Sequence, residues 1–322
     1  MKDVKYVIGV DLGGTNTVFG VVDDKGKIYD ERKIKTKDYP SFDDFVAAGC
    51  DCIKSVSEKV GGIDNICAIG IGAPNGNCYS GCIELAPNLP WKGIVPIADS
   101  FNKFLHIPVV LTNDANAAAI GEMMFGVAKG MKNFIEITLG TGVGSGIVIN
   151  EELVSGHDGF AGELGHVIMV RGDEGRMCGC GRKGCLETYC SASGMVRTAK
   201  ELLSNSTKDS LLRKKSPDMI ESKDIYDAAV QGDELAKQIF EFTGDMLGKA
   251  CADFAAFSSP EAFVFFGGVT NAGDMIMEPI KQSYEKNVFP VYKNKAKFLV
   301  SELNGKNAAV LGAAALGFKL IS

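Results

Sequence analysis

Three cysteines and one histidine in the middle of the chain have the spacing of a metal site. They follow one another as H-x11-C-x-C-x4-C, with His166 first and then Cys178, Cys180 and Cys185. One imidazole and three thiolates complete the tetrahedral shell of a structural zinc ion. His157 is an alternative fourth ligand, farther away along the chain. A shell of four protein ligands has no open position, so the predicted zinc organises a loop and carries out no chemistry.

Two glycine-rich turns have the composition of phosphate-binding loops. Asp11-Leu12-Gly13-Gly14-Thr15 and Leu139-Gly140-Thr141-Gly142 each lie between two apolar stretches. Glycine lets the main chain approach an anion closely, so successive N–H groups can bind phosphate. A single turn is better explained as a tight hairpin, but two turns at matching positions of a faint internal repeat favour phosphate. Neither turn matches the P-loop or the dinucleotide-binding pattern.

A third candidate is the pair Asn113-Asp114, which directly follows the apolar residues 109–112 and precedes an alanine-rich stretch. Two interpretations stay open at this position. An aspartate there can cap the helix that follows. It can also accept the proton of a hydroxyl group that attacks phosphorus, because sites in α/β sheets gather where strands end.

Hydrophobic periodicity predicts the elements that must position these residues. The predicted strands are 4–10, 17–22, 27–34, 67–71, 109–112, 134–139, 145–149, 263–266 and 297–301. The predicted helices are 41–60, 95–104, 115–125, 274–287 and 308–320. This order indicates an α/β protein with two lobes, each of which opens with a glycine-turned hairpin.

Composition excludes several classes of protein. The chain has 322 residues, of which 46% are hydrophobic, and a formal net charge of −6. No dense block of lysine and arginine is present, so nucleic acid is not expected as a partner. The longest apolar run, 308–318, is too short to span a bilayer, so no membrane is expected either. No secretion signal is recognised and the ten cysteines are sparse, which predicts a cytoplasmic, reducing environment.

Together these residues resemble the ROK family (repressors, open reading frames and sugar kinases) of the hexokinase/actin-like ATPase superfamily. The resemblance covers nearly the whole chain, and its cysteine-rich and Gly-Glu-x-Gly-His motifs are specific to the family. The motifs are Asp11-Leu-Gly-Gly-Thr15, Gly72-Ala-Pro74, Ala86-Pro-Asn88, Asn113-Asp114-Ala-Asn116, Leu139-Gly-Thr-Gly-Val-Gly144, Ala161-Gly-Glu163-Leu-Gly-His166, Cys178-Gly-Cys-Gly-Arg-Lys-Gly-Cys-Leu-Glu187 and Gly267-Gly268.

The resemblance implies a two-lobed actin-like (ribonuclease H-like) α/β fold with a cleft between the lobes. The first lobe would comprise residues 1–114 and the second residues 115–304 with the zinc loop. The last helix, about 305–322, would return to the first lobe. We expect a homodimer or homotetramer.

The activity that the resemblance implies is transfer of the γ-phosphoryl group of ATP to a hexose, with glucose to glucose 6-phosphate as the first expectation. N-acetylated hexosamines and mannose are the alternative sugars, and polyphosphate is the alternative donor. A sugar-sensing regulator of the same family is a further alternative. It is disfavoured because only ten residues precede Asp11, which leaves no room for a helix-turn-helix.

The resemblance also assigns roles to single residues. Asp114 matches the general base, and Asp11 matches the acid linked to Mg2+. The sugar-contacting set is Asn88, Asn113, Asp114, Glu163, His166 and Glu187. The nucleotide set is Gly13, Gly14, Thr15, Gly140, Thr141, Gly142 and, near the adenosine, Gly268. Two segments fall outside the pattern. Asn75-Gly76-Asn77 replaces the Pro-Gly that many members carry beside the sugar, and the polar run 208–227 has no motif that we can interpret.

Overall fold

The computed structural model describes residues 4–303 and 307–322 and divides the chain into two compact units. Unit 1 consists of Met1–Met131, Gly146–Gly162 and Ser301–Ser322, and unit 2 of Lys132–Ser145 and Glu163–Val300. Unit 1 thus extends past the lobe boundary suggested at residue 114, because α3 (Asp114–Phe125) packs against α9 (Ala308–Leu320) in the same unit. The other suggested boundary, between residues 304 and 305, lies outside the described residues.

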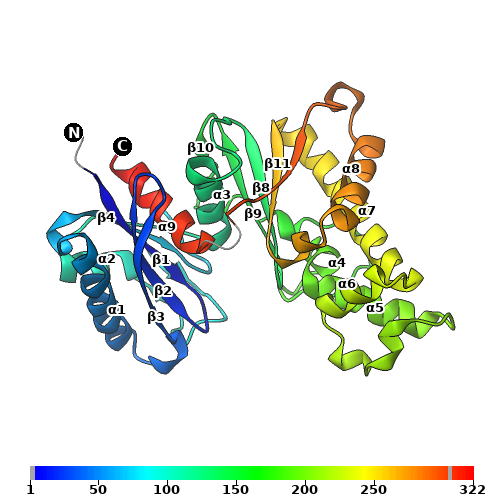
Figure 1. Ribbon diagram of the computed structural model, residues 1–322, viewed down its shortest axis with the longest axis horizontal. Coiled ribbons are helices and arrows are strands. Elements are labelled where there is room, and N and C mark those ends of the chain that lie inside the picture. Colours follow the sequence, from blue (N-terminus) through cyan, green and yellow to red (C-terminus); the bar gives the residue numbers. More distant parts are fainter. Residues whose placement is uncertain (1–3, 304–306) are drawn as a thin grey trace. The chain divides into compact units, whose positions relative to one another are not determined.

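Unit 1 is built on a five-stranded sheet in the order β3-β2-β1-β4-β7 (Figure 1). Its strands are β1 (Tyr6–Leu12), β2 (Thr17–Asp23), β3 (Ile28–Ile34), β4 (Ile66–Gly72) and β7 (Val109–Thr112). The first three pair antiparallel as the predicted meander, whereas β1, β4 and β7 run parallel. The carboxyl ends of these parallel strands therefore meet at one edge of the sheet, where sites of α/β proteins form.

Alternating residues of β1 supply the two faces of this sheet. Ile8 and Val10 belong to the core cluster that includes Ile53 of α1 (Phe42–Ser57), whereas Val7 belongs to the cluster formed with Val310 of α9. Successive side chains of a strand point to opposite faces, so one strand can serve both clusters. The second helix on the α1 side is α2 (Ile97–Leu105), which packs against α1 and β7.

The last helix, α9, lies unusually close to the sheet. A Cβ atom at Gly70 would overlap with the carbonyl oxygen of Ala313, and a Cβ at Gly9 would overlap with that of Val310. Two strand glycines therefore make room for the helix backbone, and α9 packs against β1, β4 and α3 (Figure 1). This close packing explains why residues 310–318 of α9 are buried.

A second five-stranded sheet has the order β10-β9-β8-β11-β12. Its strands are β8 (Phe134–Leu139), β9 (Val143–Ile149), β10 (Glu152–Leu153), β11 (Ala262–Phe266) and β12 (Lys297–Val300). β9 and β10 pair antiparallel, whereas β8, β11 and β12 run parallel. The strand order thus repeats that of the first sheet, which gives the faint internal repeat of the sequence a structural basis.

Five helices follow in unit 2, and α7 is the longest of them. They are α4 (Glu187–Cys190), α5 (Ala192–Asn205), α6 (Ser222–Val230), α7 (Glu234–Ser258) and α8 (Asp274–Asn287). α7 packs against α4, α5, α6 and α8 and is therefore the centre of this helical layer.

Most of the predicted elements are confirmed, and the differences have local causes. α8 and α9 have the predicted bounds, and Ser41 caps α1 as predicted. β9 begins at Val143, two residues before the predicted start, because the turn closes within Gly140–Gly142. The short hairpin of β5 (Ile83–Glu84) and β6 (Ile94–Val95) was not predicted. Within the described ranges, none of the helices has both the length and the apolar character needed to cross a membrane.

Candidate functional site

The Asn113-Asp114 pair lies where β7 ends and α3 begins. Asn113 is the N-cap of α3, since its Oδ1 accepts a hydrogen bond from the amide of Asn116 at 2.7 Å. Asp114 is the first helical residue and is exposed, and its Oδ1 accepts from the amide of Ala115 at 2.9 Å. The capping role that the sequence allowed for Asp114 is thus carried by its neighbour, and the Asp114 carboxylate lies at the surface.

Asp11 lies at the same edge of the sheet. It is in register with Gly72 of β4, which is in register with Thr112 of β7. Burial, and secondly the negative charge of Asp114, raise the pKa of Asp11 from 3.8 to about 6. A hard divalent cation such as Mg2+ would stabilise the ionised form of the Asp11 carboxylate at this position.

The first glycine turn is closed by its own backbone and by Thr36. The amide of Gly13 donates to Asn16 O at 2.9 Å, and the Thr36 hydroxyl donates to Gly13 O at 2.6 Å. A Cβ at Gly14 would overlap with the carbonyl oxygen of Asn88. The structure therefore brings Asn88, a predicted sugar ligand, against the predicted phosphate turn.

The second glycine turn, in unit 2, is held by the start of α5. Gly140 O accepts from the amide of Ala192 at 2.9 Å, and Thr141 O accepts from the hydroxyl of Ser193. Directly after the turn, the amide of Val143 donates to Oε2 of Glu187 at 3.3 Å. Hydrogen bonds to α4 and to the start of α5 thus hold the turn in place.

Glu187 also faces the cysteine cluster. Its Oε1 is 3.2 Å from Cys178 Sγ and 4.0 Å from His166 Nδ1. One carboxylate thus connects the second glycine turn to the predicted metal ligands. Glu163, the remaining predicted sugar ligand of unit 2, is exposed, and its carbonyl accepts from the amide of His166 at 3.1 Å. His166, Glu163 and Glu187 are therefore parts of one local structure.

The four predicted zinc ligands converge. One donor atom from each of His166, Cys178, Cys180 and Cys185 lies within 4.8 Å of all the others. Cys178 Sγ is 3.8 Å from His166 Nδ1, and the Sγ atoms of Cys180 and Cys185 are 3.6 Å apart. Zn–S bonds of about 2.3 Å place two tetrahedral sulfur ligands about 3.8 Å apart, so these separations suit a zinc ion.

The electrostatics of the cluster also suit a cation. Burial raises the pKa of the Cys178 thiol to about 12 and raises the pKa of Cys185 as well. Burial acts in the same direction at Cys180, but hydrogen bonds from the backbone and side chain of Arg182 outweigh it and lower that pKa to about 6. Arg182 thus stabilises one thiolate, and a metal cation would supply the positive charge that the other two need.

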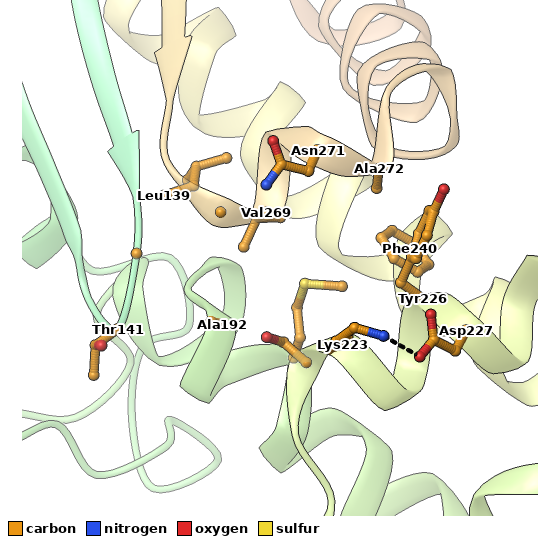
Figure 2. A pocket seen from close by; sticks show the side chains of 14 residues that line it. Leu139, Thr141, Ala192, Lys223, Tyr226, Asp227, Phe240, Val269, Asn271 and Ala272 are labelled. Atoms are coloured by element: carbon orange, nitrogen blue, oxygen red, sulfur yellow. Dashed lines mark hydrogen bonds and ion pairs between the residues drawn. The ribbon is translucent and has the colours of Figure 1, made fainter. Parts of the chain in front are cut away.

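A pocket of about 570 Å3 opens beside the second glycine turn (Figure 2). It is lined by Leu139, Gly140, Thr141, Ala192, Met195, Ser222, Lys223, Tyr226, Asp227, Phe240, Gly268, Val269, Asn271 and Ala272. The lining is largely apolar, with a few polar groups that include the ion pair of Lys223 and Asp227 at 2.6 Å. This combination of size and lining suits a flat aromatic base with an attached sugar.

Comparison with known proteins identifies the family. The sequence pattern of the ROK family matches residues 7–319. The chain belongs to the ROK family. A glucokinase from Streptomyces coelicolor is 39% identical over 316 residues, which cover 96% of each chain.

Two solved structures of ROK proteins share the fold. A ROK family glucokinase from Streptomyces griseus, in complex with glucose and AMPPNP, is 38% identical with a TM-score of 0.77, and the match covers 98% of this chain and 99% of that one. A ROK hexokinase from Thermus thermophilus is 26% identical with a TM-score of 0.83, over 98% of this chain and 99% of that one. The predicted ROK family, the two-lobed actin-like α/β fold and the enzyme class of sugar kinase are thereby confirmed.

The sequence did not predict that α6 (Ser222–Val230) lines the pocket beside the second glycine turn. Ser222, Lys223, Tyr226 and Asp227 come from α6, at the end of the polar run 208–227 that had no interpretable motif. Their spacing follows the turns of an ordinary exposed helix, so the sequence held no signal that would separate them from a solvated surface. Gly268, which was predicted to lie near the adenosine, does line this pocket.

Proposed function

We propose that this ROK kinase transfers the γ-phosphoryl group of ATP to glucose and forms glucose 6-phosphate. The proposal rests mainly on the arrangement at the start of α3. There Asn113 caps the helix, and the Asp114 carboxylate is exposed and close enough to Asp11 to affect its ionisation. The glucokinase relative, and the related structure that contains glucose and AMPPNP, support the choice of sugar and donor.

In the proposed reaction Asp114 is the general base. It accepts the proton of the sugar hydroxyl as the hydroxyl oxygen attacks the γ-phosphorus and the bond from that phosphorus to the bridging oxygen of ADP breaks. The proton ends on the Asp114 carboxylate, and the electron pair of the broken bond leaves with ADP. A base in this position contributes about 100- to 10,000-fold to the rate.

The proposed sugar ligands are Asn88, Asn113, Asp114, Glu163, His166 and Glu187. These amide, carboxylate and imidazole groups can each donate to or accept from a ring hydroxyl. A carboxylate that accepts from a hydroxyl discriminates strongly, because a sugar that lacks this hydroxyl leaves the oxygen unpaired.

The nucleotide is proposed to bind through the two glycine turns and the pocket. Main-chain amides of Gly13, Gly14 and Thr15 and of Gly140, Thr141 and Gly142 would contact phosphate oxygens. The adenosine would occupy the pocket beside Gly268. Asp11 would hold Mg2+, whose chemical contribution is to neutralise charge on the phosphates.

Zinc is proposed to be held by His166, Cys178, Cys180 and Cys185. Because Nδ1 of His166 faces the cysteines, its Nε2 remains to contact a sugar hydroxyl. The ion would supply no chemistry beyond fixing the loop that carries Glu163, His166 and Glu187. This arrangement couples the order of the loop to the affinity for sugar.

The first test is the choice of substrate. ADP release is measured with glucose, mannose, N-acetylglucosamine and N-acetylmannosamine, each with ATP and with polyphosphate as donor. The proposal expects the highest kcat/KM for glucose with ATP. A higher kcat/KM for an N-acetylated sugar would refute glucose as the substrate, and a higher kcat/KM with polyphosphate would refute ATP as the donor.

The second test concerns Asp114. Asp114→Asn should lower kcat at least about 100-fold while the Kd for glucose changes less than about threefold. The helix start should persist, because Asn113 is the cap. The control is Asp64→Asn, which removes an equal charge from an exposed position and should leave kcat unchanged. A kcat near the wild-type value in the Asp114 variant would refute its role as base.

A further inference from the structure

Two segments of unit 1 that are far apart in the sequence are joined by side-chain hydrogen bonds. The first is the turn 75–82, which the sequence analysis singled out as an unusual stretch beside the sugar. The second is the loop 155–162, which leads directly into Glu163. Asn77 Nδ2 donates to Asp158 O at 2.8 Å, and the hydroxyl of Tyr79 donates to Gly156 O at 2.7 Å.

Asn77 is buried where turn 75–82 contacts loop 155–162, and we call this contact the junction. It is 5% exposed, and its Oδ1 accepts from the amide of Tyr79 at 2.9 Å and from that of Ser80 at 3.4 Å. The oxygen therefore shapes the local turn, and the nitrogen makes the bond to the other segment. A buried carboxamide with both ends bonded has one orientation, so it can act as a fixed support.

The second segment is shaped to meet Asn77. Gly159 has a φ of +88°, and a Cβ there would lie 2.5 Å from Asn77 Oδ1. The loop is also closed on itself, since the amide of Ala161 donates to Ser155 O at 3.1 Å. The carboxamide thus rests against a short closed loop, and the last residue of that loop, Gly162, is followed by Glu163.

We propose that Asn77 is a positioning residue for the hexose, which holds loop 155–162 in place and so sets the starting point of the segment that carries Glu163. This inference rests on the proposed function, because it assumes that Glu163 contacts the sugar. Asn77 does not touch the reacting atoms in this scheme. Its loss should therefore weaken sugar binding and leave the chemical step nearly unchanged.

The test distinguishes the role of the Asn77 side-chain nitrogen from that of its oxygen. Asn77→Asp keeps an oxygen for the amides of Tyr79 and Ser80 but replaces the donor to Asp158 O with a second acceptor. The KM for glucose should rise about three- to tenfold, the range for one lost hydrogen bond, while kcat and the KM for ATP stay within twofold. Tyr79→Phe removes the second bond and should shift the KM for glucose in the same direction.

The KM for glucose of Asn77→Asp is also measured as a function of pH, because a general loss of structure would not be reversed at low pH. Below about pH 4 the introduced carboxyl group becomes protonated and can donate to Asp158 O, so the KM for glucose should return toward the wild-type value measured at the same pH. The matched control is Ser80→Ala. The Ser80 hydroxyl donates to Glu84 of β5 and forms no hydrogen bond with loop 155–162, so its loss should leave the KM for glucose unchanged.

Hydrogen–deuterium exchange distinguishes the possible failures. Amides of loop 155–162 should exchange faster in Asn77→Asp than in the wild type or in Ser80→Ala. Faster exchange with an unchanged KM for glucose would overturn the positioning role, and so would unchanged exchange. If the wild-type protein phosphorylates none of the hexoses, the proposed function fails instead, and the exchange result still reports on the junction.

Discussion

The raised pKa of Asp11 gives a quantitative prediction about stability. Its side chain has a pKa of about 6 in the folded protein against 3.8 ordinarily, because burial and the charge of Asp114 disfavour the ionised form. One pKa unit corresponds to about 1.36 kcal/mol, so a shift of about two units corresponds to about 3 kcal/mol. Above pH 6 the folded protein is destabilised by about that amount, since Asp11 must ionise there.

The direction of the pH dependence follows from the two pKa values. The folded state holds the proton more tightly than the unfolded state. The contribution of Asp11 to stability is therefore fully present below about pH 3.8 and is lost as the pH rises through about 6. Asp11→Asn removes the ionisation. Between pH 4 and pH 7 the variant should thus change from nearly equal stability to about 3 kcal/mol more stable than the wild type.

The assay is denaturant unfolding of both proteins from pH 4 to pH 8 in the presence of a chelator. The control is Asp24→Asn in the exposed turn between β2 and β3, which should show no such trend. Added Mg2+ should stabilise the wild type at pH 7 more than it stabilises the Asp11 variant, because the cation favours the ionised carboxylate. A stability difference that stays constant with pH would refute the reasoning.

Two further predictions concern the cysteine–histidine cluster and the core. Metal analysis should find about one zinc per chain. The Cys180→Ser variant should lose most of this zinc and have a lower Tm, whereas the control Cys82→Ser, which lies outside the cluster, should keep both the zinc and the Tm. A metal-free protein with an unchanged Tm would contradict the zinc site. Gly70→Ala should lower the free energy of unfolding by about 1–3 kcal/mol, because the added methyl group overlaps with Ala313 O, and an unchanged denaturation midpoint would contradict the close packing of α9.

The regular elements were predictable because their signals are local. Ser41 begins α1 since its side chain caps the amide of Asp44, and that pattern can be read from a few residues. The hairpin of β5 and β6 was missed because each strand has only two residues and no periodicity can develop over that length.

The candidate site was predictable in its composition and less so in its contacts. The cysteine and histidine ligands are close in sequence, so their spacing alone predicted the cluster that the structure contains. The link from Glu187 to the amide of Val143 was not foreseen, because it joins residues 44 positions apart. Such a contact depends on how α4 is placed beside the turn, which no local pattern records.

The sequence by itself determined the family, the two glycine turns, the Asn113-Asp114 pair and the cysteine–histidine cluster, because each depends on residue types at short spacing. Only the tertiary structure decided which residue of the pair caps α3 and why strand residues 9 and 70 are glycines. It also decided that α6 forms a wall of the pocket. The physical reason is that these outcomes depend on packing between distant segments, where a single Cβ or a single hydrogen bond selects one arrangement.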